Sequence, residues 1–360
     1  MEKRKISTKK LVLIIIACVI ISIPTIILPV STVVVYESIF SMRFHTEEYL
    51  LFSPSEFDGL VAEKSDFESN ITLTGYKYSK ENTTPRGVIV IAHGLGDGGH
   101  NKYMPYIDKF TDSGYYVFGY DGQGTDESDK KAPEGFPQAI KDLDSAIDHV
   151  QEIEEYKDLP IMLFGHSFGA YSVGNVLNHH PEVACAVMVA GFNESESMLG
   201  QYPRKVLGFL VDGVLLPYVS LYERIKFGKE YANITAVDGM KSTDAEILIV
   251  HSKDDKRVPI EYGYDIYYNE FKDNERFDFI VYDDQGHSNM LYSENAISYR
   301  GQLEENYQAY LKENSKKDKD KVRDEYMAKN IDKKLYYEPN EELFKRILDQ
   351  YEVASQIIGK

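Results

Sequence analysis

The motif Gly-His-Ser-Phe-Gly at residues 165–169 has the spacing of a serine nucleophile held in a sharp turn. It follows the apolar run 161–164, which predicts a buried strand, and precedes residues 170–180, which predict a helix. The backbone between such a strand and helix turns so tightly that only small residues fit two positions either side of Ser167. The start of the following helix would also offer backbone N–H groups to an oxyanion. We therefore predict that Ser167 is a catalytic nucleophile.

A base and a carboxylate that could activate this serine follow later in the chain, each directly after an expected strand. The base is His287, and the carboxylate is either Asp254 or Asp255. A carboxylate in this place orients the imidazole that takes the serine proton, and the chain order Ser, Asp, His is one in which this chemistry occurs. The two aspartates compete for the role, and the Val-Pro pair at 258–259 favours Asp255.

Two backbone N–H groups are candidates for stabilising the oxyanion. The sequence His-Gly-Leu-Gly at 93–96 follows the apolar run 87–92 directly, and a glycine turn at the end of a strand lets a backbone N–H face the pocket. We expect the donors to be the N–H groups of Leu95 and Phe168. This chemistry requires no metal and no cofactor, and the sequence has no His and Cys cluster with the spacing of a zinc site.

The elements that must position these residues alternate between strand and helix from about residue 67. This alternation predicts an α/β fold with a mostly parallel central sheet that is flanked by helices. Between residues 192 and 245 the alternation stops, and we expect a small helical cap there. The expected strands of the sheet lie at 87–92, 115–120, 161–164, 183–190, 246–250 and 277–282.

An apolar segment near the N-terminus has the length and the flanks of a membrane anchor. Residues 11–35 carry no charge and would span roughly 37 Å as a helix, enough to cross a hydrocarbon layer of ~30 Å. Basic residues precede the segment and acidic ones follow it, which predicts a cytoplasmic N-terminus and an extracytoplasmic catalytic domain. The alternatives are a cleaved signal peptide and lipid modification at Cys18. The long apolar run without a cleavage motif favours a retained, single-pass transmembrane helix.

The composition is that of a globular protein, and its charge argues against one class of partner. The chain of 360 residues, 43% of them hydrophobic, can build one sizeable core with appendages. Its 58 acidic and 40 basic residues give a net charge of −18, which repels phosphate backbones, so we expect no nucleic-acid partner. We expect a basic tail at 1–10, an anchor at 11–36, a linker at 37–66, a catalytic domain at 67–300 with the cap at 192–245, and a charged helical extension at 301–360.

Residues 67–299 resemble the lysophospholipase and monoacylglycerol lipase branch of the α/β-hydrolases, a group also described as serine aminopeptidase-like. The resemblance depends on VIAHGLGDGG at 90–99, YDGQGTDES at 120–128, GHSFG at 165–169, HSKDDKRVP at 251–259 and QGH at 285–287. It implies the α/β-hydrolase fold. The loop 120–128 departs from the family pattern, because it has Gln123 and Asp126 where relatives usually show a basic residue and a further glycine.

Together, the residues and the resemblance imply a serine hydrolase that cleaves carboxylic esters through an acyl-enzyme. The apolar cap and the anchor favour lipid-like esters such as monoacylglycerols or lysophospholipids, so the expected partners are a small acyl-ester substrate and the membrane. One alternative is a serine aminopeptidase-like peptidase. Another is a catalytically silent binding module, which the presence of both Ser167 and His287 disfavours.

Overall fold

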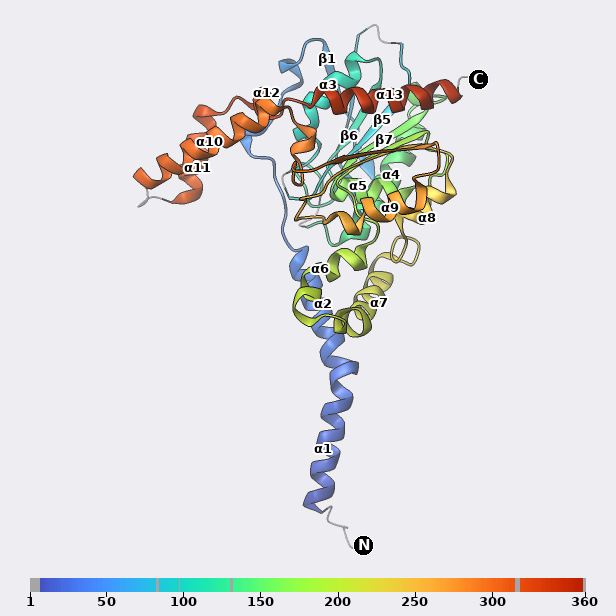
Figure 1. Ribbon diagram of the computed structural model, residues 1–360, viewed down its shortest axis with the longest axis vertical. Coiled ribbons are helices and arrows are strands. Elements are labelled where there is room, and N and C mark those ends of the chain that lie inside the picture. The colour runs from blue at the N-terminus through green and yellow to red at the C-terminus, as the bar shows by residue number, and fades with distance from the viewer. Residues whose placement is uncertain (1–6, 82–83, 97, 130–131, 315–317, 359–360) are drawn as a thin grey trace.

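The computed structural model describes residues 7–358 apart from 82–83, 97, 130–131 and 315–317 (Figure 1). Its centre is an eight-stranded sheet in the order β1-β4-β6-β5-β7-β8-β9-β10. The pairs from β6 to β10 are parallel, while β4 pairs antiparallel with both β1 and β6. The predicted α/β fold with a mostly parallel sheet is therefore confirmed. The strands are β1 (Leu60–Lys64), β4 (Gly75–Lys80), β5 (Val88–Ala92), β6 (Tyr116–Tyr120), β7 (Ile161–His166), β8 (Cys185–Val189), β9 (Glu246–Ser252) and β10 (Phe277–Tyr282).

Helices cover both faces of this sheet, which explains why β5 and β8 are continuous apolar runs buried along their whole length. On one face, α3 (Met104–Asp112) and α13 (Glu341–Ile358) pack on the sheet. On the other face lie α4 (Phe136–Glu152), α5 (Phe168–Val176), α8 (Ala236–Ser242) and α9 (Tyr264–Phe271). The carboxyl ends of the parallel strands therefore meet at one edge, where the loops that carry the candidate residues begin.

The first strands of the fold include a small sheet that is separate from the central one. The short strands β2 (Phe67–Glu68) and β3 (Thr72–Leu73) form a two-stranded sheet of their own, and β4 begins only at Gly75. Strand β1 lies inside the segment that was expected to be a linker. It is an edge strand with a single buried residue, Leu60, so its sequence lacks the apolar run that predicts a buried strand.

The segment between β8 and β9 is helical, as the sequence predicts for the cap. It contains α6 (Ser195–Leu207), a π-helical turn (Val211–Leu215) and α7 (Leu216–Phe227), followed by α8. Helices α6 and α7 lie beside the N-terminal helix, on the side of the body from which that helix projects (Figure 1). We call α6, the π-helical turn and α7 the cap.

The N-terminal helix runs over residues 8–39 as α1 (Thr8–Ser22), a π-helical turn (Ile23–Ile27) and α2 (Leu28–Ile39). Among the described residues, this helix is the one that is long and apolar enough to cross a membrane. Its most apolar window has a mean hydropathy of 3.2. The π-helical turn surrounds Pro24, whose missing N–H interrupts the regular hydrogen-bond pattern. Most of the expected basic tail at 1–10 lies outside the described residues.

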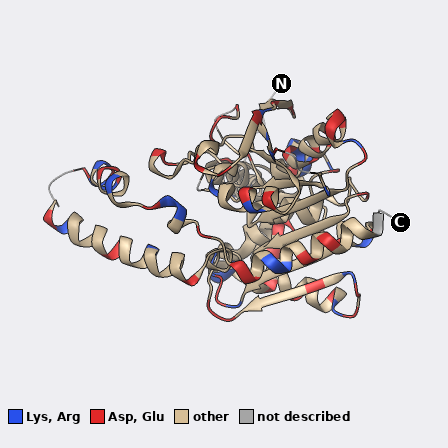
Figure 2. Ribbon diagram, turned by 90° about the horizontal axis from the view of Figure 1, so that it is seen from above, with Lys and Arg blue, Asp and Glu red and all other residues tan. Residues whose placement is uncertain are grey.

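Three helices near the C-terminus form an arm that projects from the body (Figures 1 and 2). They are α10 (Glu294–Glu313), α11 (Lys319–Asn330) and α12 (Lys333–Tyr336), and we call them the C-terminal arm. A small cluster of its own, with Leu303, Tyr307, Val322 and Met327, holds α10 against α11. After the arm the chain returns to the body as α13. The expected boundary at residue 300 therefore separates α13 from the sheet that it covers.

Candidate active site

Ser167 occupies a sharp turn between β7 and α5, with φ +57° and ψ −115°. Its N–H donates to Val189 O at 2.8 Å, which fixes the turn to the neighbouring strand. The two flanking glycines are required by close contacts: a Cβ at Gly169 would lie 1.9 Å from Ala92 O, and one at Gly165 would lie 2.5 Å from Gly169 O. The structure therefore holds the Ser167 side chain at the carboxyl edge of the sheet by a backbone that tolerates no larger residue at either glycine.

The structure brings His287 and Asp255 together with this serine. The Nε2 atom of His287 lies 2.7 Å from Ser167 Oγ, and its Nδ1 atom lies 2.7 Å from Asp255 Oδ2. The other carboxylate oxygen of Asp255 accepts hydrogen bonds from the backbone N–H groups of Arg257 and Val258, at 2.9 and 3.0 Å. Asp255 is buried, and both of its oxygens have donors, which fixes the carboxylate as an acceptor for the imidazole.

Asp254, the competing aspartate, has a different position. Its Oδ1 accepts from Ser252 Oγ and from the backbone N–H of Gly286, both at 2.7 Å. The hydrogen bond from Ser252 is the largest of the contacts that lower the pKa of Asp254, whose carboxylate is exposed to solvent. Asp254 therefore holds the backbone just before His287 and does not contact the imidazole.

The expected oxyanion donors lie on the two loops beside the serine. Phe168 N–H is the first of helix α5, so it has no acceptor within its own helix. Leu95 lies in the glycine turn after β5, where Gly94 is close enough that a Cβ on it would lie 3.5 Å from Ser167 Cβ. The two segments that carry these N–H groups are thus adjacent to the nucleophile.

His93 orders the glycine turn, a role that the sequence reading did not assign. Its Nε2 accepts from Gly122 N–H and its Nδ1 contacts Gly94 O, both at 2.8 Å. Burial lowers the pKa of His93, which keeps the ring neutral, and a neutral ring accepts at one nitrogen and donates at the other. His93 thereby ties the loop after β5 to the loop after β6. His93 lies inside a motif that the sequence shows, but its hydrogen-bond partner Gly122 belongs to a segment remote in the chain.

His166, inside the serine motif, supports the backbone of His287. It is fully buried between Tyr103 Oη at 3.2 Å and His287 O at 3.2 Å. Burial holds the pKa of His166 well below its ordinary value, and the nearby His287 and Lys102 lower it further. Its ring therefore stays neutral and acts as a spacer between α3 and the loop of His287.

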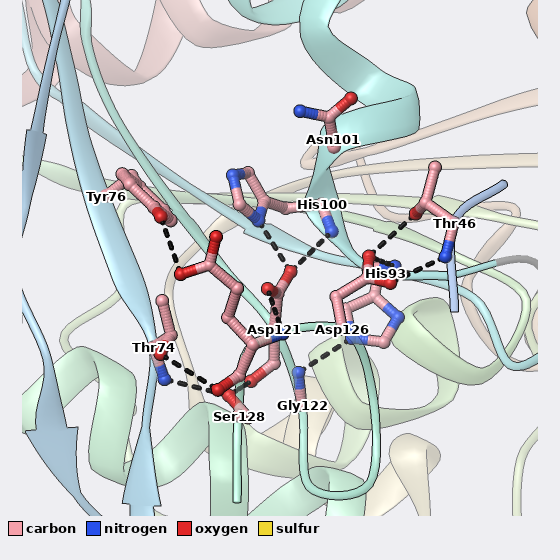
Figure 3. Close-up of polar contacts among 12 residues, drawn as sticks. Thr46, Thr74, Tyr76, His93, His100, Asn101, Asp121, Gly122, Asp126 and Ser128 are labelled. Carbon is pink, nitrogen blue, oxygen red and sulfur yellow. Dashed lines mark hydrogen bonds and ion pairs between the residues drawn. The ribbon is translucent and has the colours of Figure 1, made fainter. Parts of the chain in front are cut away.

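The loop 120–128, which departs from the family pattern, is held by the buried Asp121 and the partly buried Asp126 (Figure 3). Asp126 accepts hydrogen bonds from Thr46 N–H and Oγ1 at 2.6 Å and from Gly99 N–H at 2.7 Å. Asp121 lies 2.7 Å from His100 Nδ1. Burial opposes ionisation of Asp121, yet its contacts, His100 first among them, hold its pKa below the ordinary value. The departure thus lets this loop bind the chain segment that follows the N-terminal helix.

An apolar surface lies on the side of Ser167 that faces the cap. The ring centre of Phe136 lies 5.9 Å from that of Phe168, in a tilted arrangement, and 4.9 Å from that of Phe192, in an edge-on arrangement. Phe40, at the end of the N-terminal helix, packs at 5.0 Å from Phe136. Leu95 packs against the same buried cluster. The N-terminal helix is therefore joined by aromatic contacts to the residue that follows the nucleophile.

Sequence comparisons match the central part of the chain to known hydrolases. Residues 83–240 match the model of the serine aminopeptidase family S33. A monoglyceride lipase of Mus musculus is 27% identical over 39% of this chain and 48% of its own length. The phospholipase YtpA of Bacillus subtilis is 37% identical over 24% of this chain and 32% of its own length. The chain therefore spans about half or less of these relatives.

Structural comparison extends the likeness to most of the chain. The esterase Pf2001 of Pyrococcus furiosus superposes with a TM-score of 0.51 at 17% identity, covering 73% of this chain and 95% of the esterase. At this identity the likeness concerns the fold. With the eight-stranded sheet, it shows that the chain has the α/β-hydrolase fold, and the sequence matches make its central part similar to serine aminopeptidase-like hydrolases, monoglyceride lipases and a phospholipase.

Proposed function

We propose that the chain is a serine hydrolase that cleaves carboxylic esters, with Ser167 as nucleophile, His287 as base and Asp255 as the orienting carboxylate. The observation that carries this proposal is the pair of 2.7 Å contacts that His287 makes with Ser167 Oγ and with Asp255 Oδ2. A base within hydrogen-bond reach of the nucleophile, itself held by a buried carboxylate, is the geometry that this chemistry requires.

The reaction would proceed in two halves. Ser167 Oγ attacks the ester carbonyl as His287 takes its proton, and the N–H groups of Leu95 and Phe168 stabilise the oxyanion. His287 then gives the proton to the departing alcohol, and an acyl-enzyme remains on Ser167. In the second half, His287 deprotonates a water molecule, which attacks the acyl carbonyl. The carboxylic acid leaves and Ser167 regains its proton.

The apolar surroundings support a lipid-like acyl group. The aromatic surface of Phe136, Phe168 and Phe192 lies next to the nucleophile and would accept an alkyl chain. A further apolar groove of about 260 Å³ lies between α2 and the cap, and Val35, Tyr202 and Leu215 are among its lining residues. The named activities of the sequence relatives, a monoglyceride lipase and a phospholipase, agree with a lipid ester.

We further propose that the N-terminal helix is a retained membrane anchor, with its N-terminus in the cytoplasm and the catalytic domain outside. The cap next to it carries exposed apolar side chains, with Val206 and Phe209 each 83% exposed, which is costly in water but favourable at a bilayer surface. Tyr36 Oη donates to the buried Glu223 of α7 at 2.7 Å. A cleaved N-terminal peptide would lose this contact, so the contact supports retention.

The test is labelling of the full-length chain, in non-ionic detergent, with a fluorophosphonate probe that reacts with activated serines. We expect labelling of the wild-type chain, none with Ser167→Ala, and at least a hundredfold slower labelling with His287→Ala. Ser288→Ala is the matched control, because Ser288 follows His287 but contacts only His166 among these groups. Labelling that persists without Ser167 would overturn the assignment. A series of p-nitrophenyl esters and amino-acid p-nitroanilides then separates ester from peptide specificity.

A further inference from the structure

A cleft of about 410 Å³ opens beside His287, and its lining residues do not include those of the aromatic surface, Phe136, Phe168 and Phe192. Its wall on the body is formed by Gly96, His287 and Ser288. The opposite wall comes from the C-terminal arm and from the segment 45–50 that follows the N-terminal helix. Both outer segments lie outside residues 83–240, the part of the chain that matches the family model.

The charge of the cleft is opposite to that of the whole molecule. Four permanently basic side chains line it, and Glu47 is its acidic lining residue, whereas the chain carries a net charge of −18. The four are Lys102, Arg257, Arg300 and Arg323. A concentration of one charge sign in a concave site raises the local concentration of ligands of the other sign. A neutral substrate would gain no attraction from these basic side chains.

The guanidinium of Arg300 in α10 is held by two tyrosine rings, and one of its nitrogen atoms remains without a hydrogen-bond acceptor in the described part of the chain. Its guanidinium lies 3.6 Å from the ring centre of Tyr292 and 4.2 Å from that of Tyr336, and its Nε donates to Tyr336 O at 2.6 Å. Its buried Nη2 atom has no hydrogen-bond partner among the described residues. The stacked rings fix the plane of the guanidinium, which lowers the entropy cost of binding a planar or tetrahedral oxyanion.

The other two arginines differ in how they are paired. Arg323 of α11 forms a long ion pair of 3.8 Å with Glu304, and both side chains are about half exposed. Arg257 is exposed, and no ion pair within the described residues involves it. Arg257 also lies two residues after Asp255, so its charge is carried by the same loop that orients His287. An anionic ligand would therefore meet Arg257, which has no ion pair among the described residues, and the Nη2 atom of Arg300, which has no hydrogen-bond partner there.

The position of the cleft indicates which part of a substrate it would hold. The acyl chain is expected on the aromatic side, next to Phe168, while His287 passes the proton to the alcohol that departs. A cleft lined by His287 therefore lies on the leaving-group side. This argument rests on the proposed esterase function and extends it to the second half of the substrate.

We propose that the cationic cleft binds an oxyanion carried by the leaving group, so that the substrates are acyl esters of anionic alcohols. Phosphate and carboxylate share the chemistry that the cleft recognises, since both accept paired hydrogen bonds from a guanidinium. A lysophospholipid with an exposed phosphate, such as lysophosphatidic acid, combines such an anion with an acyl chain for the aromatic side. Hydrolysis would release the free fatty acid and the anionic alcohol, with water as the only co-reactant.

The first experiment compares three oleoyl esters on the full-length chain in non-ionic detergent micelles. The substrates are oleoyl lysophosphatidic acid, the oleate ester of lactate and monooleoylglycerol, so that the headgroup is a phosphate, a carboxylate or neutral. We expect a KM for at least one anionic ester roughly tenfold below that for monooleoylglycerol, and a rise in that KM with salt. The better of the two anionic esters identifies the source of the anion.

Variants of the cleft separate recognition from catalysis. Arg257→Gln and Arg300→Gln should each raise the KM for the preferred anionic ester about tenfold and should change the KM for monooleoylglycerol far less. Lys345→Gln, on the exposed side of α13 and outside the cleft, makes the same charge change and should alter neither. If loss of the stacked Arg300 impairs folding, the exposed Arg257 still provides a variant that tests the proposal. Unchanged kinetics in both arginine variants would overturn the proposal and leave the esterase function standing.

A binding measurement decides the proposal even if the esterase function fails. Calorimetric titration of full-length Ser167→Ala with glycerol 3-phosphate, and separately with lactate, should show binding of at least one anion. Adding Arg300→Gln or Arg257→Gln should weaken that binding about tenfold. No binding of either anion, or binding that both arginine variants leave unchanged, would overturn the proposal. Absence of Ser167-dependent hydrolysis of all three esters would instead overturn the proposed function.

Discussion

Ser167 adopts φ +57°, a value that residues other than glycine rarely take. Such a backbone costs on the order of 1–3 kcal/mol and persists only where its surroundings determine it. Here the surroundings are the hydrogen bond from Ser167 N–H to Val189 O and the glycines at 165 and 169, whose lack of a side chain lets three backbone segments meet. The strain thus serves to present the hydroxyl to His287.

The two neighbouring aspartates divide the support of His287, which gives a prediction at this scale. Asp255→Asn should lower kcat by roughly a thousandfold to ten-thousandfold, because the N–H groups of Arg257 and Val258 would hold the amide oxygen, and the amide NH2 would then face His287 Nδ1 and favour the wrong tautomer. Asp254→Asn should lower it only several-fold, since the backbone N–H of Gly286 keeps an oxygen acceptor. Kinetics on a short-chain p-nitrophenyl ester measure both, and equal losses would contradict the assignment of roles.

The sequence is sufficient to predict Ser167, Asp255 and His287 as candidates, because each follows a strand directly and residue type and order narrow the choice. It is not sufficient for the residues that shape the site through remote partners. His93 contacts the loop after β6, and Asp126 contacts Thr46 from the segment after the N-terminal helix. Such pairings depend on three-dimensional proximity, which local periodicity does not contain.

At the scale of elements, burial explains which segments could be predicted. Strands covered on both faces, such as β5 and β8, read as apolar runs, and the amphipathic spacing of Leu343, Ile347 and Tyr351 predicts α13. Periodicity does not tell which other element the apolar face of a helix packs against. The buried face of α13 packs on the sheet, with Tyr351 Oη donating to Leu163 O at 3.0 Å, and no local signal distinguishes this from an extension outside the core.

His180, just after α5, links two helices on one face of the sheet by charge. Its Nε2 lies 2.9 Å from Asp144 of α4, and its Nδ1 lies 2.8 Å from Glu182. Burial opposes protonation of His180, but these two carboxylates outweigh it and raise its pKa above the ordinary 6.5. A raised folded-state pKa means that the stabilisation is complete below pH 6.5 and is lost as the pH rises through the raised value.

We therefore predict that His180→Gln destabilises the protein more at pH 6 than at pH 9. A loss of about 1 kcal/mol at pH 6 would lower Tm by roughly 2–4 °C, and the difference from wild type should narrow at pH 9. His179→Gln is the matched control, because the partly buried His179 stacks on Tyr231 and contacts the backbone oxygen of Glu230, and no ion pair in the described part of the chain joins it to a carboxylate. Thermal unfolding across this pH range measures the effect. A loss that is independent of pH would show that the contact stabilises by packing alone.

Across the whole molecule, the two sides of the nucleophile differ in chemistry and in origin. The aromatic side is built by the body, the cap and the end of the N-terminal helix, and the cationic side by the body, the C-terminal arm and the segment 45–50. An amphiphilic ester with an apolar acyl chain and a charged alcohol matches this division. The segment between the N-terminal helix and β1 thus takes part in the site, because Asp126 fixes it beside Gly99.

The end of the N-terminal helix should accordingly be part of the catalytic domain and not only a tether. Phe40 is buried against Tyr36 and Phe136, so Phe40→Ala removes an aromatic side chain from the cluster that joins the helix to the cap, at a cost of roughly 3–5 kcal/mol. We expect faster tryptic cleavage in the cap, at Arg204 and Arg224, and a kcat/KM for long-chain esters at least tenfold lower.

A matched control separates this effect from a general disturbance of the N-terminal helix. Val34 lies on α2 and is 59% exposed, so Val34→Ala should change neither cleavage in the cap nor kcat/KM. Short-chain esters, which make little use of the cap, should be affected less than long-chain ones in Phe40→Ala. Equal cap cleavage and equal kcat/KM in Phe40→Ala and Val34→Ala would contradict this prediction. The end of the N-terminal helix would then take no part in hydrolysis of long-chain esters.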